Sequence, residues 1–118
     1  MFSELLNSES HSIRGKAFTF HEISSLDWIN HLVMEDEPDD QSHKALAVRN
    51  REFLVKVIAA SLAPGVDSSV PDLVAEMAPL SESLISELFA AADQVNGITE
   101  RLNGYAGKVS PADDTAAA

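Results

Sequence analysis

The chain has 118 residues, and its 19 acidic side chains against 8 Lys and Arg give a formal net charge of −11. This length accommodates a single domain around one hydrophobic core. The acidic balance argues against binding to nucleic acids and to anionic membrane surfaces, because both attract basic proteins. The absence of cysteine excludes disulfides and thiolate chemistry and is typical of a reducing cytosol.

A short β-strand is predicted near the N-terminus. Phe18 and Phe20 alternate with small or polar residues over residues 17–21, which is the two-residue period of a strand. A single strand is not stable alone. We therefore expect it to pair with part of the first sixteen residues as a β-hairpin, with a turn at Arg14-Gly15-Lys16.

A first helix is expected from Ser24 and Ser25, which are good N-cap residues, to about Met34. Its apolar residues recur at helical spacing and comprise Leu26, Ile29, Leu32 and Val33. Trp28 flanks this stripe. Its large area favours a place in the core or at its edge, and the alternative is a contact with a partner.

An acidic run of five carboxylates and one proline follows over residues 35–40. It lacks the spaced ligands and turn glycine of a calcium loop, so a solvated loop is the preferred interpretation. The four histidines lack zinc-ligand spacing, and no nucleophile or phosphate-binding motif is present. We therefore expect no metal site, no cofactor and no enzymatic activity.

The densest apolar run predicts a central helix from near Ser42 to Leu62, ended by Ala63-Pro64-Gly65. Its core face has spacings of one, three and four and comprises Phe53, Leu54, Val57, Ile58 and Leu62. Lys56 interrupts the run, which is also too short to cross a membrane. These features indicate a core helix of a soluble protein.

Two more helices are predicted. A short one starts at Ser69 and Pro71, and a longer one starts at the N-cap Ser81. For the end of the longer helix we prefer Asn103-Gly104, with a break at Asn96-Gly97 as the alternative. The predicted fold is mainly α, a single domain of about four helices with a short N-terminal hairpin over residues 1–108. Residues 109–118 are too weakly hydrophobic to fold and are predicted to be a disordered tail.

The last helix has a wide apolar face, which we take as a candidate surface for a partner or for self-association. The face comprises Ile85, Leu88, Phe89, Ala92 and Val95. In the alternative interpretation it packs on residues 53–62, since small domains need most of their apolar residues inside. Residues 21–45 hold seven acids and one Lys, whereas in residues 46–70 three basic residues outnumber two acids. Head-to-tail self-association could use this asymmetry, and solvated faces of a monomer are the simpler reading.

The order of these segments resembles a known family. The strand at residues 18–23 runs directly into the helix at residues 24–32, and an acidic linker precedes Phe53-Leu54-Val55. Arg101-Leu102-Asn103-Gly104-Tyr105 and then Ala106-Gly107-Lys108 follow the last helix. From about Phe18 to Lys108 this order is similar to the tail assembly chaperones of long-tailed bacteriophages, which are minor tail proteins of viral tail assembly.

The resemblance implies a protein of the infected bacterial cytoplasm that is absent from the mature virion. Such a chaperone binds and solubilises the tape measure protein and helps to recruit tail tube subunits. It also implies a longer form that engages the tail tube protein, made by ribosomal frameshifting, for which Gly107 and Lys108 are the candidate position. Residues 1–108 would then be shared by both products. The family has no catalytic residues.

Two other functions stay open at this point. One is a small acidic helical regulator, of the antitoxin or anti-activator type, that neutralises a protein partner. The other is an enzyme subunit whose site assembles from distant residues. Neighbouring genes for a tail tube protein and a very long tape measure protein would distinguish the chaperone from the regulator, and turnover assays would reveal the enzyme.

Overall fold

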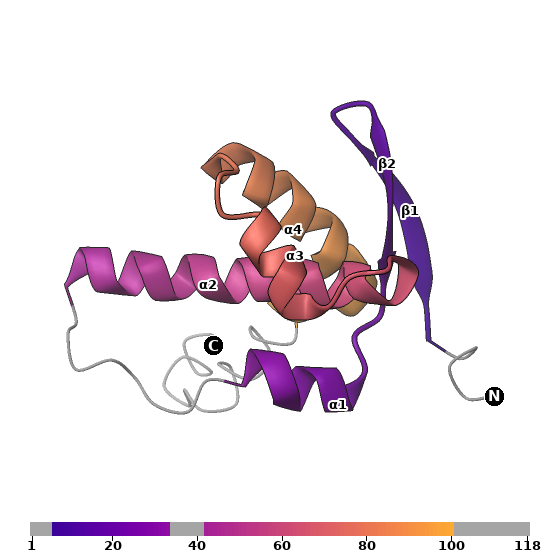
Figure 1. The fold of residues 1–118 in the computed structure, drawn as a ribbon, viewed down its shortest axis with the longest axis horizontal. Coiled ribbons are helices and arrows are strands. Elements are labelled where there is room, and N and C mark those ends of the chain that lie inside the picture. Colours follow the sequence, from indigo (N-terminus) through magenta and orange to yellow (C-terminus); the bar gives the residue numbers. More distant parts are fainter. Residues whose placement is uncertain (1–5, 34–41, 101–118) are drawn as a thin grey trace, which may run out of the picture.

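The computed structural model describes residues 6–33 and 42–100. It is mainly α-helical with an antiparallel two-stranded N-terminal hairpin, which confirms the predicted fold class (Figure 1). The acidic run, the Asn103-Gly104 stop, the candidate frameshift position and the predicted tail lie outside the described residues. None of the described helices is long and apolar enough to cross a membrane.

The hairpin joins β1 (Ser8–Ile13) to β2 (Lys16–His21), with Ser8 opposite His21 at its open end. Arg14 and Gly15 form the turn with positive φ angles of 53° and 86°. Two consecutive positive φ values match the right-handed twist of the strands, which is why such turns are favoured in tight hairpins. The predicted strand, its partner and its turn are therefore confirmed.

The first helix starts as α1 (Ser25–Asp27) and continues as a π-helical turn, η2 (Trp28–Leu32). The Ser24 hydroxyl caps it by accepting a hydrogen bond from the Asp27 N–H at 3.1 Å. Its predicted apolar stripe is wrong, because only Leu32 of the four residues is buried. The other three are largely exposed, namely Leu26 at 65%, Ile29 at 64% and Val33 at 54%.

The segment buries a different side instead. Trp28 and Leu32, which are four residues apart, pack against the core. The Trp28 ring meets Phe53 edge-on, with 6.5 Å between the ring centroids. The prediction of Trp28 as a core-edge aromatic is confirmed.

The central helix is α2 (His43–Leu62), capped by Ser42 and followed by the 3₁₀ turn η3 (Ala63–Gly65). Figure 1 shows its first half projecting from the body and its second half surrounded by the other elements. Val57, Ile58 and Leu62 are buried as predicted, whereas Phe53 and Leu54 are only half-buried. The second half of the helix therefore carries most of the core.

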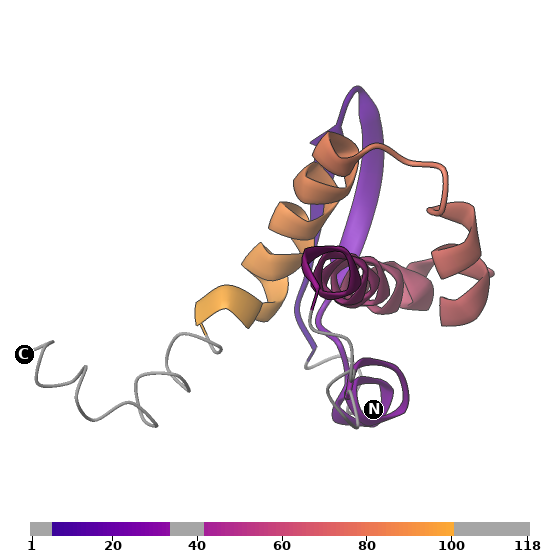
Figure 2. The ribbon, with the colours of Figure 1, turned by 90° about the vertical axis from the view of Figure 1, so that its left-hand side faces the viewer.

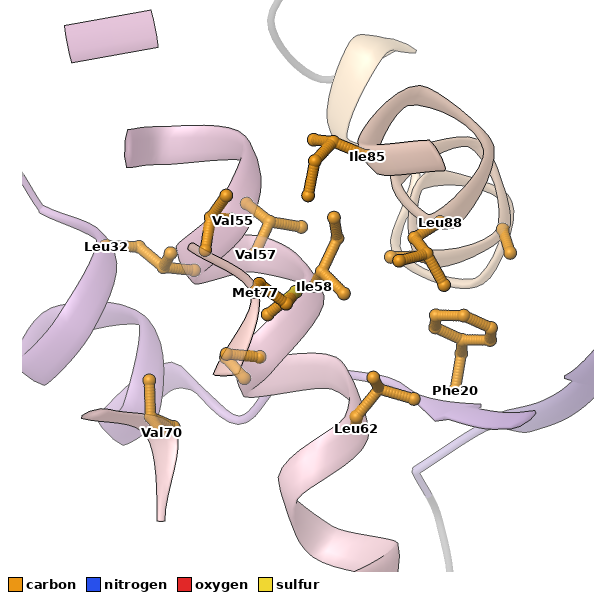
Figure 3. Packing of buried hydrophobic residues seen from close by; sticks show 14 of the residues in the cluster. Phe20, Leu32, Val55, Val57, Ile58, Leu62, Val70, Met77, Ile85 and Leu88 are labelled. Carbon is orange, nitrogen blue, oxygen red and sulfur yellow. The ribbon is translucent and has the colours of Figure 1, made fainter. Parts of the chain in front are cut away.

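Two shorter helices, α3 (Val70–Glu76) and α4 (Glu82–Asn96), lie on opposite sides of α2, with the hairpin between them (Figure 2). Their N-caps are Ser69 and Ser81, as predicted. Ile58 of α2 lies between Met77, which directly follows α3, and Ile85 of α4 (Figure 3). Phe20 points toward Leu88 in the same view. One core thus joins the hairpin to three helices.

The end of α4 differs from the preferred prediction. Gly97 adopts the left-handed conformation, with φ 63° and ψ 37°, and ends the helix at Asn96. Glycine adopts this conformation without a steric cost, and the Gly97 N–H still donates to the Asp93 carbonyl. The break expected as the alternative at Asn96-Gly97 is therefore confirmed. Helical structure resumes at residues 98–100, and the predicted end at Asn103-Gly104 lies outside the described residues.

Ile58→Ala should lower the free energy of unfolding by about 2–5 kcal/mol, because a fully buried side chain would be replaced by a cavity. Phe53→Ala should cost less, since Phe53 is only half-buried. Leu46→Ala is a control on the exposed half of α2, where 42% of the side chain is exposed. Urea denaturation of the variants measures these changes. Equal stabilities of the Ile58 and Leu46 variants would contradict this description of the core.

Candidate functional site

The predicted face of the last helix is mostly interior. Ile85, Leu88 and Ala92 are buried, and Phe89 and Val95 are half-buried against the same core. The face packs toward α2, as the alternative interpretation of this face expected. Its use by a partner or in self-association stays a prediction, and it would require α4 to move away from α2.

An apolar groove of about 430 Å³ lies beside this face, between the hairpin, α3 and α4. Its apolar lining comes from every neighbouring element and comprises Ile13, Phe18, Leu62, Leu73, Met77, Leu80, Leu84 and Leu88. Three charged residues complete the lining, namely Arg14, Lys16 and Glu76. We call this site the hairpin groove. Apolar walls with a few charged groups at the edge are the usual composition of a binding site.

The hairpin wall of the groove is tied to α4 at its tip. Arg14 donates from Nε and Nη2 to Glu87 Oε2 at 3.0 and 2.7 Å, and from Nη2 to the Ser83 hydroxyl at 3.1 Å. The hydrogen bond and the charge of Glu87 raise the pKa of Arg14. This ion pair is exposed and contributes little to stability, but it positions the turn above the groove.

The opposite end of the groove is positioned by Arg51 of α2. Its guanidinium donates to the Leu80 carbonyl at 3.0 Å and lies 3.5 Å from the Met77 carbonyl. These carbonyls follow the end of α3, where a cation is favoured by the helix dipole. Arg51 therefore fixes the link between α3 and α4, from which Met77 and Leu80 enter the groove.

The base of the hairpin is fixed by Asn96 at the end of α4. Its Oδ1 accepts the Ile23 N–H at 2.7 Å, and its Nδ2 donates to the carbonyls of Ala92 at 2.9 Å and His21 at 3.3 Å. The hydroxyl of Ser61, which is fully buried in α2, donates to the same His21 carbonyl at 2.7 Å. We call this set of hydrogen bonds the polar clasp. It joins the hairpin, α2 and α4 at one point.

The 3₁₀ turn after α2 packs closely on the hairpin beside the clasp. A Cβ atom at Gly65 would lie 2.7 Å from Nε2 of His21. Only glycine permits this approach without a shift of the ring. The contact sets the position of η3 against β2 and thereby the side of the groove that Leu62 forms.

A second apolar surface lies on the outer side of the first helix. It consists of Leu26, Ile29 and Val33, the three side chains that do not reach the core. Their separations of three and four residues place them along one side of the segment. We call this surface the outer row, and it is a candidate for self-association because such contiguous exposed apolar residues mark interaction sites.

The described residues include an apolar groove and an exposed apolar row. No group of three or more His, Asp or Glu residues in the described ranges is arranged to hold a metal ion. The apolar walls of the hairpin groove can hold a ligand by burying its apolar surface. The isolated charged residues can orient that ligand. This arrangement is suited to the side chains of an amphipathic helix.

Sequence reasoning missed the hairpin groove. The short helix and the last helix were each expected from their own N-caps and apolar spacing. Their periodicity indicated that each helix has an apolar side. It did not indicate that the two sides and the hairpin together leave an open space.

Comparison of the chain with protein-family models, with characterised proteins and with solved structures finds no match.

Asn96→Ala should lower the free energy of unfolding by about 1–3 kcal/mol, because the His21 carbonyl and Ile23 N–H lose a partner in a partly buried place. Asn50→Ala is the matched control, since Asn50 is an exposed residue of α2. Amide hydrogen exchange should speed up in β1 and β2 of the Asn96 variant alone. Unchanged hairpin protection would show that the clasp does not hold the hairpin.

Proposed function

We propose that this protein is a phage tail assembly chaperone, which binds and solubilises the tape measure protein during tail morphogenesis. The hairpin groove is the observation that carries the proposal, together with the order of segments that resembles this family. The protein would act in the cytoplasm of the infected bacterium and leave before the virion matures. It would work by binding and not by catalysis.

The size and lining of the groove support this role. A tape measure protein presents long apolar helical stretches, which aggregate unless they are covered. A groove of about 430 Å³ has room for a few large side chains, such as those at i and i+4 of an amphipathic helix. Each leucine that is fully buried there would contribute about 1.5–3 kcal/mol, so a few contacts give reversible binding.

The charge of the chain supports the second requirement of a chaperone, which is solubility of the complex. With a net charge of −11, copies bound along one tape measure protein repel other complexes and resist precipitation. The same charge makes a nucleic acid or an anionic membrane an unsuitable partner.

The proposed recruitment of tail tube subunits depends on a longer, frameshifted product. In that product a second segment would follow residue 108, after the codons of Gly107 and Lys108. Helix α4 ends at Asn96, so the helices that form the groove are complete before that point. An added segment can therefore follow without disturbing them. The frameshift itself requires a gene sequence with a run of G and then A at this position and an open −1 frame.

Co-expression with the tape measure protein tests the function directly. We expect the wild-type chain to move the tape measure protein into the soluble fraction. Leu84→Glu should abolish this effect, because it places a carboxylate among the apolar side chains of the groove. Leu46→Glu adds the same charge on the exposed half of α2 and should behave like wild type.

Circular dichroism of both variants must show folded protein before their effects are compared. An insoluble tape measure protein in the presence of the wild-type chain would contradict the proposed function. Strong binding to a different single protein encoded beside this gene would favour the regulator instead.

Self-association is also part of the proposal, and the outer row gives it a surface. Leu26→Lys should weaken self-association, because the substitution places a charge in the apolar row. Leu6→Lys is the control, since it introduces the same charge at an exposed residue before the hairpin. If opposite charges steer the association, added salt should reduce it. Sedimentation that shows only monomer from micromolar to millimolar protein would contradict self-association.

A further inference from the structure

The two sides of the hairpin groove carry opposite charges. Lys16 lies on the hairpin side and Glu76 on the α3 side, and both side chains are exposed. The Lys16 ammonium lies 5.5 Å from the centroid of the Phe18 ring, at the edge of the apolar lining. Over residues 6–33 and 42–100, neither Lys16 nor Glu76 forms an ion pair.

The third charged residue of the groove has a different role. The Arg14 guanidinium is occupied by Glu87 and Ser83 of α4. Lys16 is therefore the cation of the groove that is open to a ligand, in a chain whose net charge is −11. A ligand that buries apolar side chains in the groove places its own flanking residues beside Lys16 on one side and Glu76 on the other.

We propose that the groove selects an amphipathic helix whose apolar stripe has an acidic residue on one flank and a basic residue on the other. Lys16 pairs with the acidic flank and Glu76 with the basic flank. Reversing the direction of such a helix would exchange its flanks and put like charges together, so the two residues also fix its direction in the groove. The identification of this helix with a tape measure segment rests on the proposed function, whereas the charge preference does not.

Three stapled helical peptides with the same leucine stripe test the preference. The first has Glu on one flank and Lys on the other, the second has Glu on both flanks, and the third has Lys on both. Wild-type protein should bind the first most tightly. Each replaced flank should weaken binding about two- to fivefold, which is the range for an exposed ion pair, and added salt should remove the difference.

Lys16→Glu makes both sides of the groove acidic, so the peptide with two Lys flanks should become the tightest ligand. Lys44→Glu introduces the same change in net charge at an exposed position of α2 and should leave the wild-type order intact. Because both lysines are exposed, neither variant should unfold. Isothermal titration calorimetry on the full chain gives the three dissociation constants.

Equal binding of the three peptides to wild type, or an unchanged order in Lys16→Glu, would overturn the proposal. Failure of the first peptide to bind at millimolar concentration would also overturn it. So would binding that occurs only after the protein is diluted enough to separate its copies, because a second copy of the chain would then be the occupant of the groove. The correct order of peptides together with an insoluble tape measure protein would refute the proposed function alone. Solubilisation without any charge preference would refute this inference alone.

Discussion

The polar clasp is the constraint on which the other features depend. Asn96 and Ser61 form hydrogen bonds with two backbone groups where the chain leaves the hairpin, namely the His21 carbonyl and the Ile23 N–H. Such groups are costly to bury without a partner, so three segments that are distant in sequence must meet at this point. Gly97 then ends α4 directly after Asn96. The clasp therefore decides where the hairpin stands against α2 and α4.

The hairpin groove follows from that placement. The hairpin is fixed at its base by the clasp and at its tip by the Arg14–Glu87 ion pair, and between these points Ile13 and Phe18 line the groove opposite residues of α3 and α4. A two-stranded hairpin is not stable alone, and here it forms one wall of the hairpin groove. The hairpin groove, with its apolar lining, is the surface on which the proposed binding of a tape measure protein depends.

Local patterns in the sequence predicted local structure well. The alternation of Phe18 and Phe20 located the strand, and serine N-caps located the starts of the helices, because both signals act over a few residues. Apolar spacing did not predict the π-helical turn, and it did not show that the outer row would face away from the core. The clasp was also hidden, since Ile23 and Asn96 are 73 positions apart and neither residue is unusual in its local context. The groove depends on the clasp and was missed for the same reason.

The most direct test of the central claim is the position of a bound partner on the protein. Methyl resonances of leucine, isoleucine, valine and methionine can be followed by NMR while a solubilised tape measure segment is added. If the hairpin groove is the binding site, the methyl groups of Leu73, Met77 and Leu84 should shift, and those of the outer row should not. Shifts confined to Leu26, Ile29 and Val33, with the groove unchanged, would contradict the account.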